Sequence, residues 1–418
     1  MKQLRILFAC VFVVMVGYGI TLTVLPFYAE RVHGLATVDR RTLTLHIGFL
    51  TSVYAFAQLV AAPILGRLAD KIGRRPVLLS GLAGMAVTQM MFGFVPNLWL
   101  LYVMRTLGGI ATAGMLVAST TYVADATTEA DRARGMAWFG TAVSLGLVAG
   151  PALGGILSRP GFTLGSGDLR LDGYSLPFLI AGLLALVVLV AARRLPESRS
   201  THPQEAGRVL PGPSSDGEPR QPGLRTLLSL VVASQFGLAL FEGTFVLYAQ
   251  DRIQLGPTRA AAAFMVCGVV MAAFQVVAVG ALARVIPSIS QIAVGLALMG
   301  GGIAALIATR AFTLLLGAIG VLALGTALVT PNLSALISSH DRPRTATALG
   351  LKSAAGSLGQ FGGPVTGSIM LGWRPDSPFA VVGVALIAIG VGVGVGFSRR
   401  RGPTISRTTD ADTEPRAP

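Results

Sequence analysis

The sequence predicts an all-α integral membrane protein with twelve transmembrane helices, arranged as two six-helix pseudo-symmetric halves. Three observations predict this fold class. Hydrophobic residues make up 53% of the 418 residues and charged residues only 12%, whereas a soluble chain carries roughly 25% charge. Apolar segments of the length that crosses a bilayer, about 20 residues, recur along the whole chain. Landmarks of the first half also recur in the second half.

The twelve expected spans follow from the apolar segments in order. Lys2 and Arg5 precede the first one, but its apolar run continues to Ala29 without a small-x-small cleavage site, so we expect a retained helix. The expected spans are residues 5–28, 43–66, 76–96, 98–121, 136–157, 176–195, 224–249, 259–282, 289–308, 311–337, 345–371 and 378–398.

The net charge of +14 is interpreted as a topology signal. With the N-terminus in the cytoplasm, 22 of the 33 Lys and Arg residues fall on the cytoplasmic side and nine outside. The positive-inside rule therefore predicts a multi-pass protein of the cell inner (plasma) membrane with both termini cytoplasmic. Because the arginines are dispersed among loops without interleaved aromatic residues, no nucleic-acid partner is expected.

A polar segment divides the chain into two halves. Residues 196–223 contain PGPSSDGEPRQPG, which is too polar to cross a membrane and too rich in proline for a stable helix. We expect a cytoplasmic linker there, an N-terminal six-helix half at 1–195, a C-terminal half at 224–398 and a cytoplasmic tail at 399–418.

The halves are internal repeats with offsets of 220, 214 and 213 residues. A nearly constant offset over six spans predicts two halves related by an axis along the membrane normal, with the substrate site between them near the bilayer midplane. The repeated landmarks are LPFYA at Leu25 with FVLYA at Phe245, GRLAD at Gly66 with GALAR at Gly280, and GxxxGPxxG at Gly146 with the same pattern at Gly359.

The short loop between the second and third spans carries the motif GRLADKIGRR, which begins at Gly66. Gly66 lets two helices approach, Gly73 permits a tight reversal, and Arg74 and Arg75 anchor the loop inside the cell. Asp70 is placed to pair with a cation or a helix N-terminus. The motif resembles the cytoplasmic loop signature of the major facilitator superfamily, and the resemblance implies a major facilitator fold in which this loop latches the two halves together.

The fifth span carries Gly146, Gly150, Pro151, Gly154 and Gly155. The glycines remove side chains where helices cross, and the proline interrupts the backbone hydrogen bonds. The pattern resembles the motif of the proton-coupled exporters of the superfamily, which favours export over uptake. For the equivalent face of the eleventh span we expect packing of small residues only.

Glu242 stands apart from the other eighteen acidic residues, because it alone lies within an apolar stretch, residues 227–249. A membrane carboxylate is a functional-site hypothesis, since hydrocarbon does not solvate charge. Arg105 lies in LYVMRTLGG, which resembles the superfamily motif whose arginine is linked to proton transfer. Both residues lie about seven residues inside the outer ends of their helices, so their depths agree at about 1.5 Å per residue.

Two interpretations of this pair stay open. If Arg105 and Glu242 face one cavity, the arginine keeps the carboxylate ionised until substrate or opening separates them, and both take part in proton coupling. Alternatively, Arg105 donates to carbonyl groups of a neighbouring helix, and Glu242 is permanently protonated and bonded between helices.

Two branches of the superfamily's twelve-span drug:proton antiporters are similar to different parts of the chain. The first six spans resemble the tetracycline exporters, and residues 239–248 resemble the seventh span of the fluoroquinolone and multidrug exporters. Tetracycline exporters have membrane carboxylates where this chain has Val14 and Thr88, and the quinolone type has an acid near Ala327. A tetracycline-specific pump is therefore disfavoured, and coupling would depend on Glu242.

These resemblances imply a proton-coupled secondary active exporter of drugs or other amphipathic small molecules that works as a monomer by alternating access. A lone carboxylate in an apolar cavity favours lipophilic cations. The alternative is a metabolite, siderophore or lipid carrier of the same superfamily. The aromatic and amide residues that could line the cavity are Tyr18, Tyr54, Gln58, Gln235, Phe241, Gln275 and Asn332.

Enzymatic chemistry is disfavoured by the placement of reactive residues. The four histidines are scattered over loops and helix starts, and no Walker loop of the form GxxxxGK[ST] is present. Cys10 and Cys267 lie in separate apolar spans and form neither a disulfide framework nor a metal-ligand cluster. No enzyme activity, cofactor or metal is expected.

Overall fold

The computed structural model describes residues 2–32, 34–126, 129–158, 163–164, 171–197, 222–280, 282, 285–340 and 345–400. The regular structure in this part of the chain is helical, apart from one hairpin of two-residue strands, β1 (Thr163–Leu164) and β2 (Leu171–Asp172). The prediction of an all-α membrane protein is confirmed. The helices are α1 (Lys2–Ala29), α2 (Arg40–Ile72), α3 (Arg74–Phe92), α4 (Leu98–Ala126), α5 (Glu129–Leu157), α6 (Leu176–Ala192), α7 (Leu224–Ile253), α8 (Pro257–Gly280), α9 (Ser288–Ala305) followed by the short 3₁₀ helix η2 (Leu306–Ala308), α10 (Phe312–His340), α11 (Thr345–Trp373) and α12 (Ser377–Arg400).

Nine helices of the described chain are long and apolar enough to span a membrane. Of the other three, α6 has 17 residues, α3 begins with two arginines and α11 is rich in glycine and serine. All three pack against the spanning helices, α3 on α4, α6 on α1 and α11 on α7. The bundle therefore contains the twelve helices that were expected.

Several helices extend beyond the apolar segments that predicted them. The helix α2 runs from Arg40 to Ile72, whereas the apolar segment spans only residues 43–66. Hydropathy detects the part of a helix that lies in hydrocarbon, but backbone hydrogen bonding continues into the polar interface. At the start of α2, the carboxylate of Asp39 accepts hydrogen bonds from the backbone N–H groups of Arg41 and Thr42 and fixes where the helix begins.

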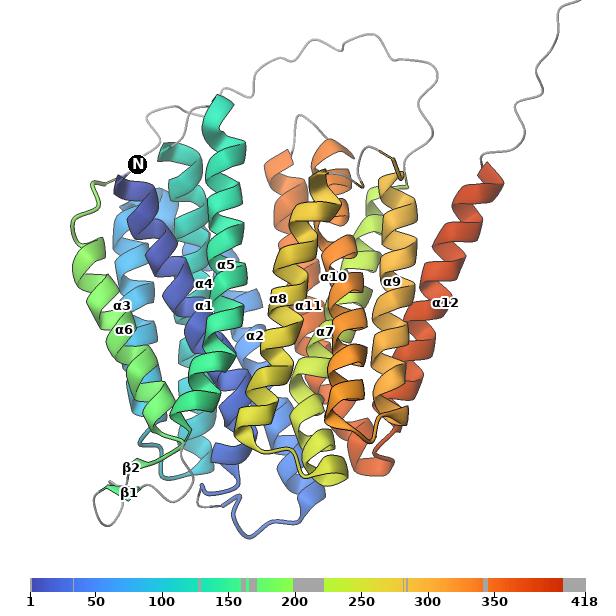
Figure 1. Ribbon diagram of the computed structural model, residues 1–418. Coiled ribbons are helices and arrows are strands. Elements are labelled where there is room, and N and C mark those ends of the chain that lie inside the picture. Colours follow the sequence, from blue (N-terminus) through green and yellow to red (C-terminus); the bar gives the residue numbers. More distant parts are fainter. Residues whose placement is uncertain are drawn as a thin grey trace, which may run out of the picture.

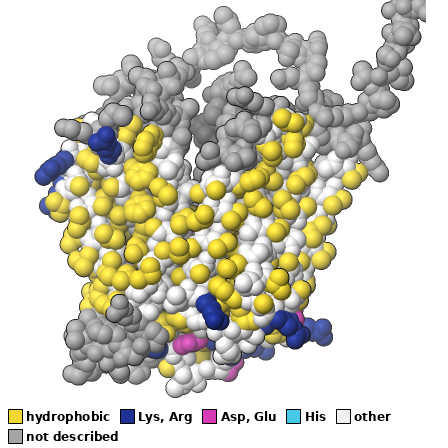
Figure 2. All heavy atoms as spheres, in the orientation of Figure 1, with side chains coloured by type: hydrophobic (Ala, Val, Ile, Leu, Met, Phe, Trp, Pro, Cys, Tyr) yellow, Lys and Arg dark blue, Asp and Glu magenta, His cyan; other side chains and the backbone are white. Residues whose placement is uncertain are grey.

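The two ends of the bundle are named here by their connections. The N-terminal face holds the start of α1 and the connection between α2 and α3, and the opposite face holds the end of α1 and the β1–β2 hairpin (Figure 1). In the view of Figure 2, hydrophobic side chains cover the band between these faces, and Lys and Arg side chains gather at its edges. A lipid bilayer fits this distribution.

The repeated glycine motif packs equivalent helices in the two groups. In α5, a Cβ atom at Gly150 would lie 2.8 Å from the Cα atom of Gly19 in α1. In α11, a Cβ atom at Gly363 would lie 2.7 Å from the backbone nitrogen of Leu240 in α7. The helix pairs α1–α5 and α7–α11 thus approach as closely as their backbones permit, because glycine occupies the contact.

The first six helices and the last six meet mainly toward the opposite face. There Gly48 of α2 packs against Pro364 of α11, and Gly155 of α5 packs against Ala261 of α8. Toward the N-terminal face the ribbons of α5 and α8 diverge (Figure 1). The structure is therefore closed at the opposite face.

Candidate functional site

A hydrogen bond between α1 and α7 joins the two groups of helices. The hydroxyl group of Tyr18 donates to Oε2 of Glu242 over 3.1 Å, although the two residues are 224 positions apart in the sequence. Both side chains are partly buried. The membrane carboxylate is therefore held, through Tyr18, at the contact between the two groups.

Tyr18 is part of a stack of side chains in the first group of helices. Its ring lies 5.7 Å from the ring of Tyr54 on α2, with 29° between the planes. The guanidinium group of Arg105 on α4 lies 4.6 Å from the centre of the Tyr54 ring on which it stacks. The hydroxyl group of Tyr54 donates to Oγ1 of Thr112 on α4 over 2.8 Å. The series Arg105, Tyr54, Tyr18 and Glu242 therefore connects four helices.

Arg105 and Glu242 do not meet directly. Both residues are described, and the structure contains no ion pair between them. Nε of Arg105 instead donates to the backbone oxygen of Leu50 on α2 over 3.0 Å. The interpretation in which Arg105 binds a carbonyl of a neighbouring helix agrees with this geometry, and Tyr18 stands between the two charged groups.

Glu242 lines a cavity of about 60 Å³, here called the Glu242 cavity. Its walls come from α1, α5, α7 and α8 and are mostly apolar. The α8 wall includes the side chains of Phe264, Cys267 and Met271. None of these three residues was expected in the cavity, but their spacing of three and four positions is the pattern of one helix face. Pro151 of the α5 motif lines the same cavity.

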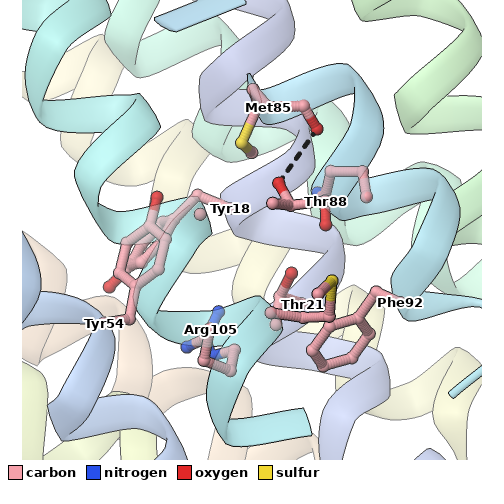
Figure 3. A pocket seen from close by; sticks show the side chains of 10 residues that line it. Tyr18, Thr21, Tyr54, Met85, Thr88, Phe92 and Arg105 are labelled. Atoms are coloured by element: carbon pink, nitrogen blue, oxygen red, sulfur yellow. Dashed lines mark hydrogen bonds between the residues drawn. The ribbon is translucent and has the colours of Figure 1, made fainter. Parts of the chain in front are cut away.

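Arg105 lines a separate cavity of about 10 Å³, here called the Arg105 cavity. In Figure 3, Tyr18 and Tyr54 lie on one side of it and Thr88 and Phe92 on the other, with Arg105 between them. Two of these residues, Tyr18 and Tyr54, were among the expected cavity residues. Gln89, which also lines this cavity, was not expected.

The remaining expected cavity residues lie elsewhere. Phe241 is fully buried against Phe245 and Phe264, Gln235 accepts a hydrogen bond from Gln360 over 3.3 Å, and Asn332 donates to Gln291 over 3.0 Å. These three residues connect neighbouring helices of the second group, and none of them lines the Glu242 cavity or the Arg105 cavity. Gln58 is partly buried, one turn beyond Tyr54. The side chain of Gln275 lies outside the described residues.

The loop motif that begins at Gly66 makes its contacts within the first group. Arg74 bridges Asp70, at 3.1 Å, and Asp125 of α4, at 3.0 Å. The backbone of Gly73 has φ of +106°, which favours glycine, and a Cβ atom there would collide with Glu197. In this conformation the motif therefore ties α2, α3, α4 and the segment after α6 together. Its role as a latch between the halves stays a prediction.

The glycines of α5 divide between two partners. Gly146, Gly150 and Gly154 face α1, whereas Gly155 faces Ala261 of α8, in the other group of helices. One helix face thus packs within its own group, and the neighbouring position touches the other group. Among the described residues, no group of three His, Cys, Asp or Glu side chains could hold a metal ion.

A twelve-helix membrane bundle in two groups, with a carboxylate at the contact between them, has the architecture of a multi-pass membrane transporter. The sequence profile of the Major Facilitator Superfamily matches residues 7–340. The chain therefore belongs to the major facilitator superfamily, as the loop motif and the repeats predicted.

Curated relatives cover most of the chain. Multidrug resistance protein 2 of Bacillus subtilis (strain 168) is 27% identical over 91% of this chain and 92% of its own length. Tetracycline resistance protein, class G, of Vibrio anguillarum is 32% identical over 69% of this chain and 70% of its own length. Among solved structures, the human organic anion transporter MFSD10 (TETRAN) has a TM-score of 0.67 at 22% identity, over 94% of this chain and 98% of that one. That likeness concerns the fold alone.

Proposed function

We propose that this protein is a proton-coupled exporter of drugs or other amphipathic small molecules. The observation that carries the proposal is the hydrogen bond of Glu242 to Tyr18 beside an apolar cavity, at the contact between the two groups of helices. The multidrug and tetracycline resistance proteins among the relatives support export of drugs over other transport.

The Glu242 cavity supports a lipophilic cation as the favoured substrate. An ionised carboxylate attracts a cation, and the Phe264 and Met271 side chains offer an aromatic ring and a polarisable sulfur to an apolar body. Protonation of Glu242 removes the attraction and releases the drug. The O–H group of Tyr18 stabilises the ionised form because it donates to the carboxylate.

The transport cycle follows alternating access in the plasma membrane. With the N-terminal face in the cytoplasm, as the distribution of Lys and Arg residues predicts, a conformation closed at the opposite face is inward-facing. Drug enters from the cytoplasm and binds at ionised Glu242, and the halves, residues 1–195 and 224–398, rock around the site. A proton from outside then binds Glu242, drug leaves, and the proton is released to the cytoplasm. One monomer suffices, since it contains both halves.

The test uses inverted membrane vesicles with an acid interior. Addition of a lipophilic cation should dissipate the pH gradient through wild type and not through Glu242→Gln. Asp39→Asn is the matched control, because it also replaces a carboxylate by an amide but lies exposed in a loop and keeps a side chain that can cap α2.

Two results would contradict the proposal. Equal gradient dissipation by wild type and Glu242→Gln would remove Glu242 from coupling. A panel in which no drug but a sugar, a siderophore or a lipid produces a response would replace drug export by the carrier alternative.

A further inference from the structure

Arg105 is a buried cation whose charge is not balanced by a neighbouring carboxylate. It is 5% exposed, and the described residues include no acid in ion-pair contact with it. Its Nε bonds to the backbone oxygen of Leu50 and its face lies on the Tyr54 ring. For its two terminal nitrogens, which carry four N–H donors, the structure gives no acceptor among the described residues. An uncompensated buried charge is costly.

A second donor lies at the same cavity. Gln89 is 6% exposed, and its Nε2 has no hydrogen-bond partner among the described residues. The amide lies against Gly17 of α1, where a Cβ atom would collide with Nε2. Both Arg105 and Gln89 line the Arg105 cavity, so unused donors from α3 and α4 surround one small space.

The other polar groups of the Arg105 cavity do not satisfy these donors. Oγ1 of Thr21 donates to the backbone oxygen of Gly17, and Oγ1 of Thr88 donates to the backbone oxygens of Gly84 and Met85. None of the ten lining residues is acidic. Tyr18 also lines the cavity, but its O–H group points to Glu242. The site therefore offers positive charge and N–H donors, and it lacks a negative partner.

We propose that Arg105 and Gln89 form a binding site for a small monovalent anionic group, distinct from the Glu242 cavity. A cavity of about 10 Å³ has room for a group of about one heavy atom beyond its walls, such as chloride or one end of a carboxylate. Such a group accepts the free N–H donors and balances the arginine charge. The anion can be free chloride or the carboxylate of a transported zwitterion; only the second source rests on the proposed export function.

Thermal unfolding of the purified full-length protein tests the site without transport. At constant ionic strength, replacing gluconate, which is too large for the cavity, by chloride should raise Tm in a saturable way by about one to two degrees in wild type. Gln89→Leu should abolish this response, because it removes the amide donor and keeps the side-chain volume. Gln235→Leu, which removes a membrane amide outside the cavity, should keep it.

A second pair of ligands separates the two sources. A zwitterionic aromatic compound should compete with chloride for the Tm shift in wild type, and its methyl ester, which lacks the carboxylate, should not. Competition by neither compound would assign the anion to free chloride alone. Equal chloride responses in wild type and Gln89→Leu, or no response in wild type, would overturn the site. Loss of gradient dissipation in Glu242→Gln is an independent result, so failure of the anion site and failure of the export proposal can be told apart.

Discussion

At the scale of single residues, the hydroxyl group of Tyr18 is the contact on which Glu242 depends. Glu242 was identified from the sequence because acids are rare in apolar spans, but Tyr18 was only one of seven expected cavity residues, and the partner considered for Glu242 was Arg105. The structure selects Tyr18 because α1 and α7 cross where both side chains can reach the same point. A neutral donor that bonds to a charged acceptor contributes about 1.5–3 kcal/mol.

We predict that Tyr18→Phe lowers the rate of drug-dependent proton release by roughly ten- to a hundredfold at limiting drug concentration. The ring and its stacking on Tyr54 remain, and only the O–H donor is lost. The measurement is the rate of gradient dissipation in inverted vesicles. Tyr102→Phe is the control, because it removes a hydroxyl group that contacts His46 away from the site. A Tyr18→Phe rate equal to the Tyr102→Phe rate would remove the hydrogen bond from the mechanism.

Asp39 is a residue whose effect depends on pH. Its pKa is lowered from 3.8, mainly by the hydrogen bond from the Thr42 hydroxyl group and also by the backbone N–H of Thr42. A lowered pKa in the folded state means that stabilisation is complete above the unfolded pKa and is lost as pH falls through the folded pKa.

The prediction for Asp39 is a small loss of stability below about pH 4 in wild type that Asp39→Asn does not share, because asparagine caps without titrating. Tm measured from pH 5 to pH 2.5 for both proteins gives the comparison. Parallel curves over this range would show that the carboxylate does not stabilise α2 through its charge.

At the scale of elements, glycine decides how closely helices pack. A Cβ atom at Gly150 would meet the backbone of α1, which cannot move aside as a flexible side chain can. Gly140 lies on the same helix, ten residues earlier, and has no heavy atom within 4 Å of the position of a Cβ atom. The two glycines therefore separate packing from helix propensity.

We expect Gly150→Ala to lower the free energy of unfolding by about 1–3 kcal/mol, as overpacking does. Gly140→Ala should be neutral or stabilising by up to about 1 kcal/mol, because alanine has the higher helix propensity. Thermal unfolding in detergent measures both. If Gly150→Ala were as stable as Gly140→Ala, α1 and α5 would have room that the structure does not give them.

At the scale of the whole molecule, Arg40 links the two groups of helices at the opposite face. Its guanidinium group lies 2.8 Å from Oε1 of Glu30 and 2.8 Å from Oδ1 of Asp251, and Nη2 also donates to Oε1 of Gln250 over 3.2 Å. Glu30 belongs to the first group of helices, whereas Gln250 and Asp251 belong to α7 of the second group. One cation thus contacts both groups where the structure is closed, in addition to the helix packing there.

We predict that Arg40→Gln shifts the population toward an opening of this face. Each partly exposed ion pair contributes about 0.2–1 kcal/mol. Loss of the two pairs therefore costs about 0.4–2 kcal/mol, which changes the ratio of the two states by roughly two- to thirtyfold. Spin labels at the exposed positions Thr37 and Ala311 report the separation of the groups. Arg310→Gln, at an exposed arginine outside the cluster, is the control. An unchanged distance distribution in Arg40→Gln would exclude the cluster as a gate.

The sequence by itself determined the membrane class, the helices and the superfamily. Hydropathy, internal repetition and the loop motif are patterns that can be recognised in a sequence without knowing which residues are in contact. It also identified Glu242 and Arg105, since charge in an apolar span stands out in any conformation. The helix ends were predicted less accurately, because the residues of α2 at the membrane interface are helical without being apolar.

Only the tertiary structure decided which side chains meet. Equal depth suggested that Arg105 faces Glu242, but depth says nothing about direction around a helix, and Tyr18 lies between them. Asn332 and Phe241 have the composition of cavity residues, yet the rotation of their helices places them in the packing of the second group. Gln89 gave no signal in the sequence, since an amide beside Thr88 lines a cavity only when α1 and α4 pack around it.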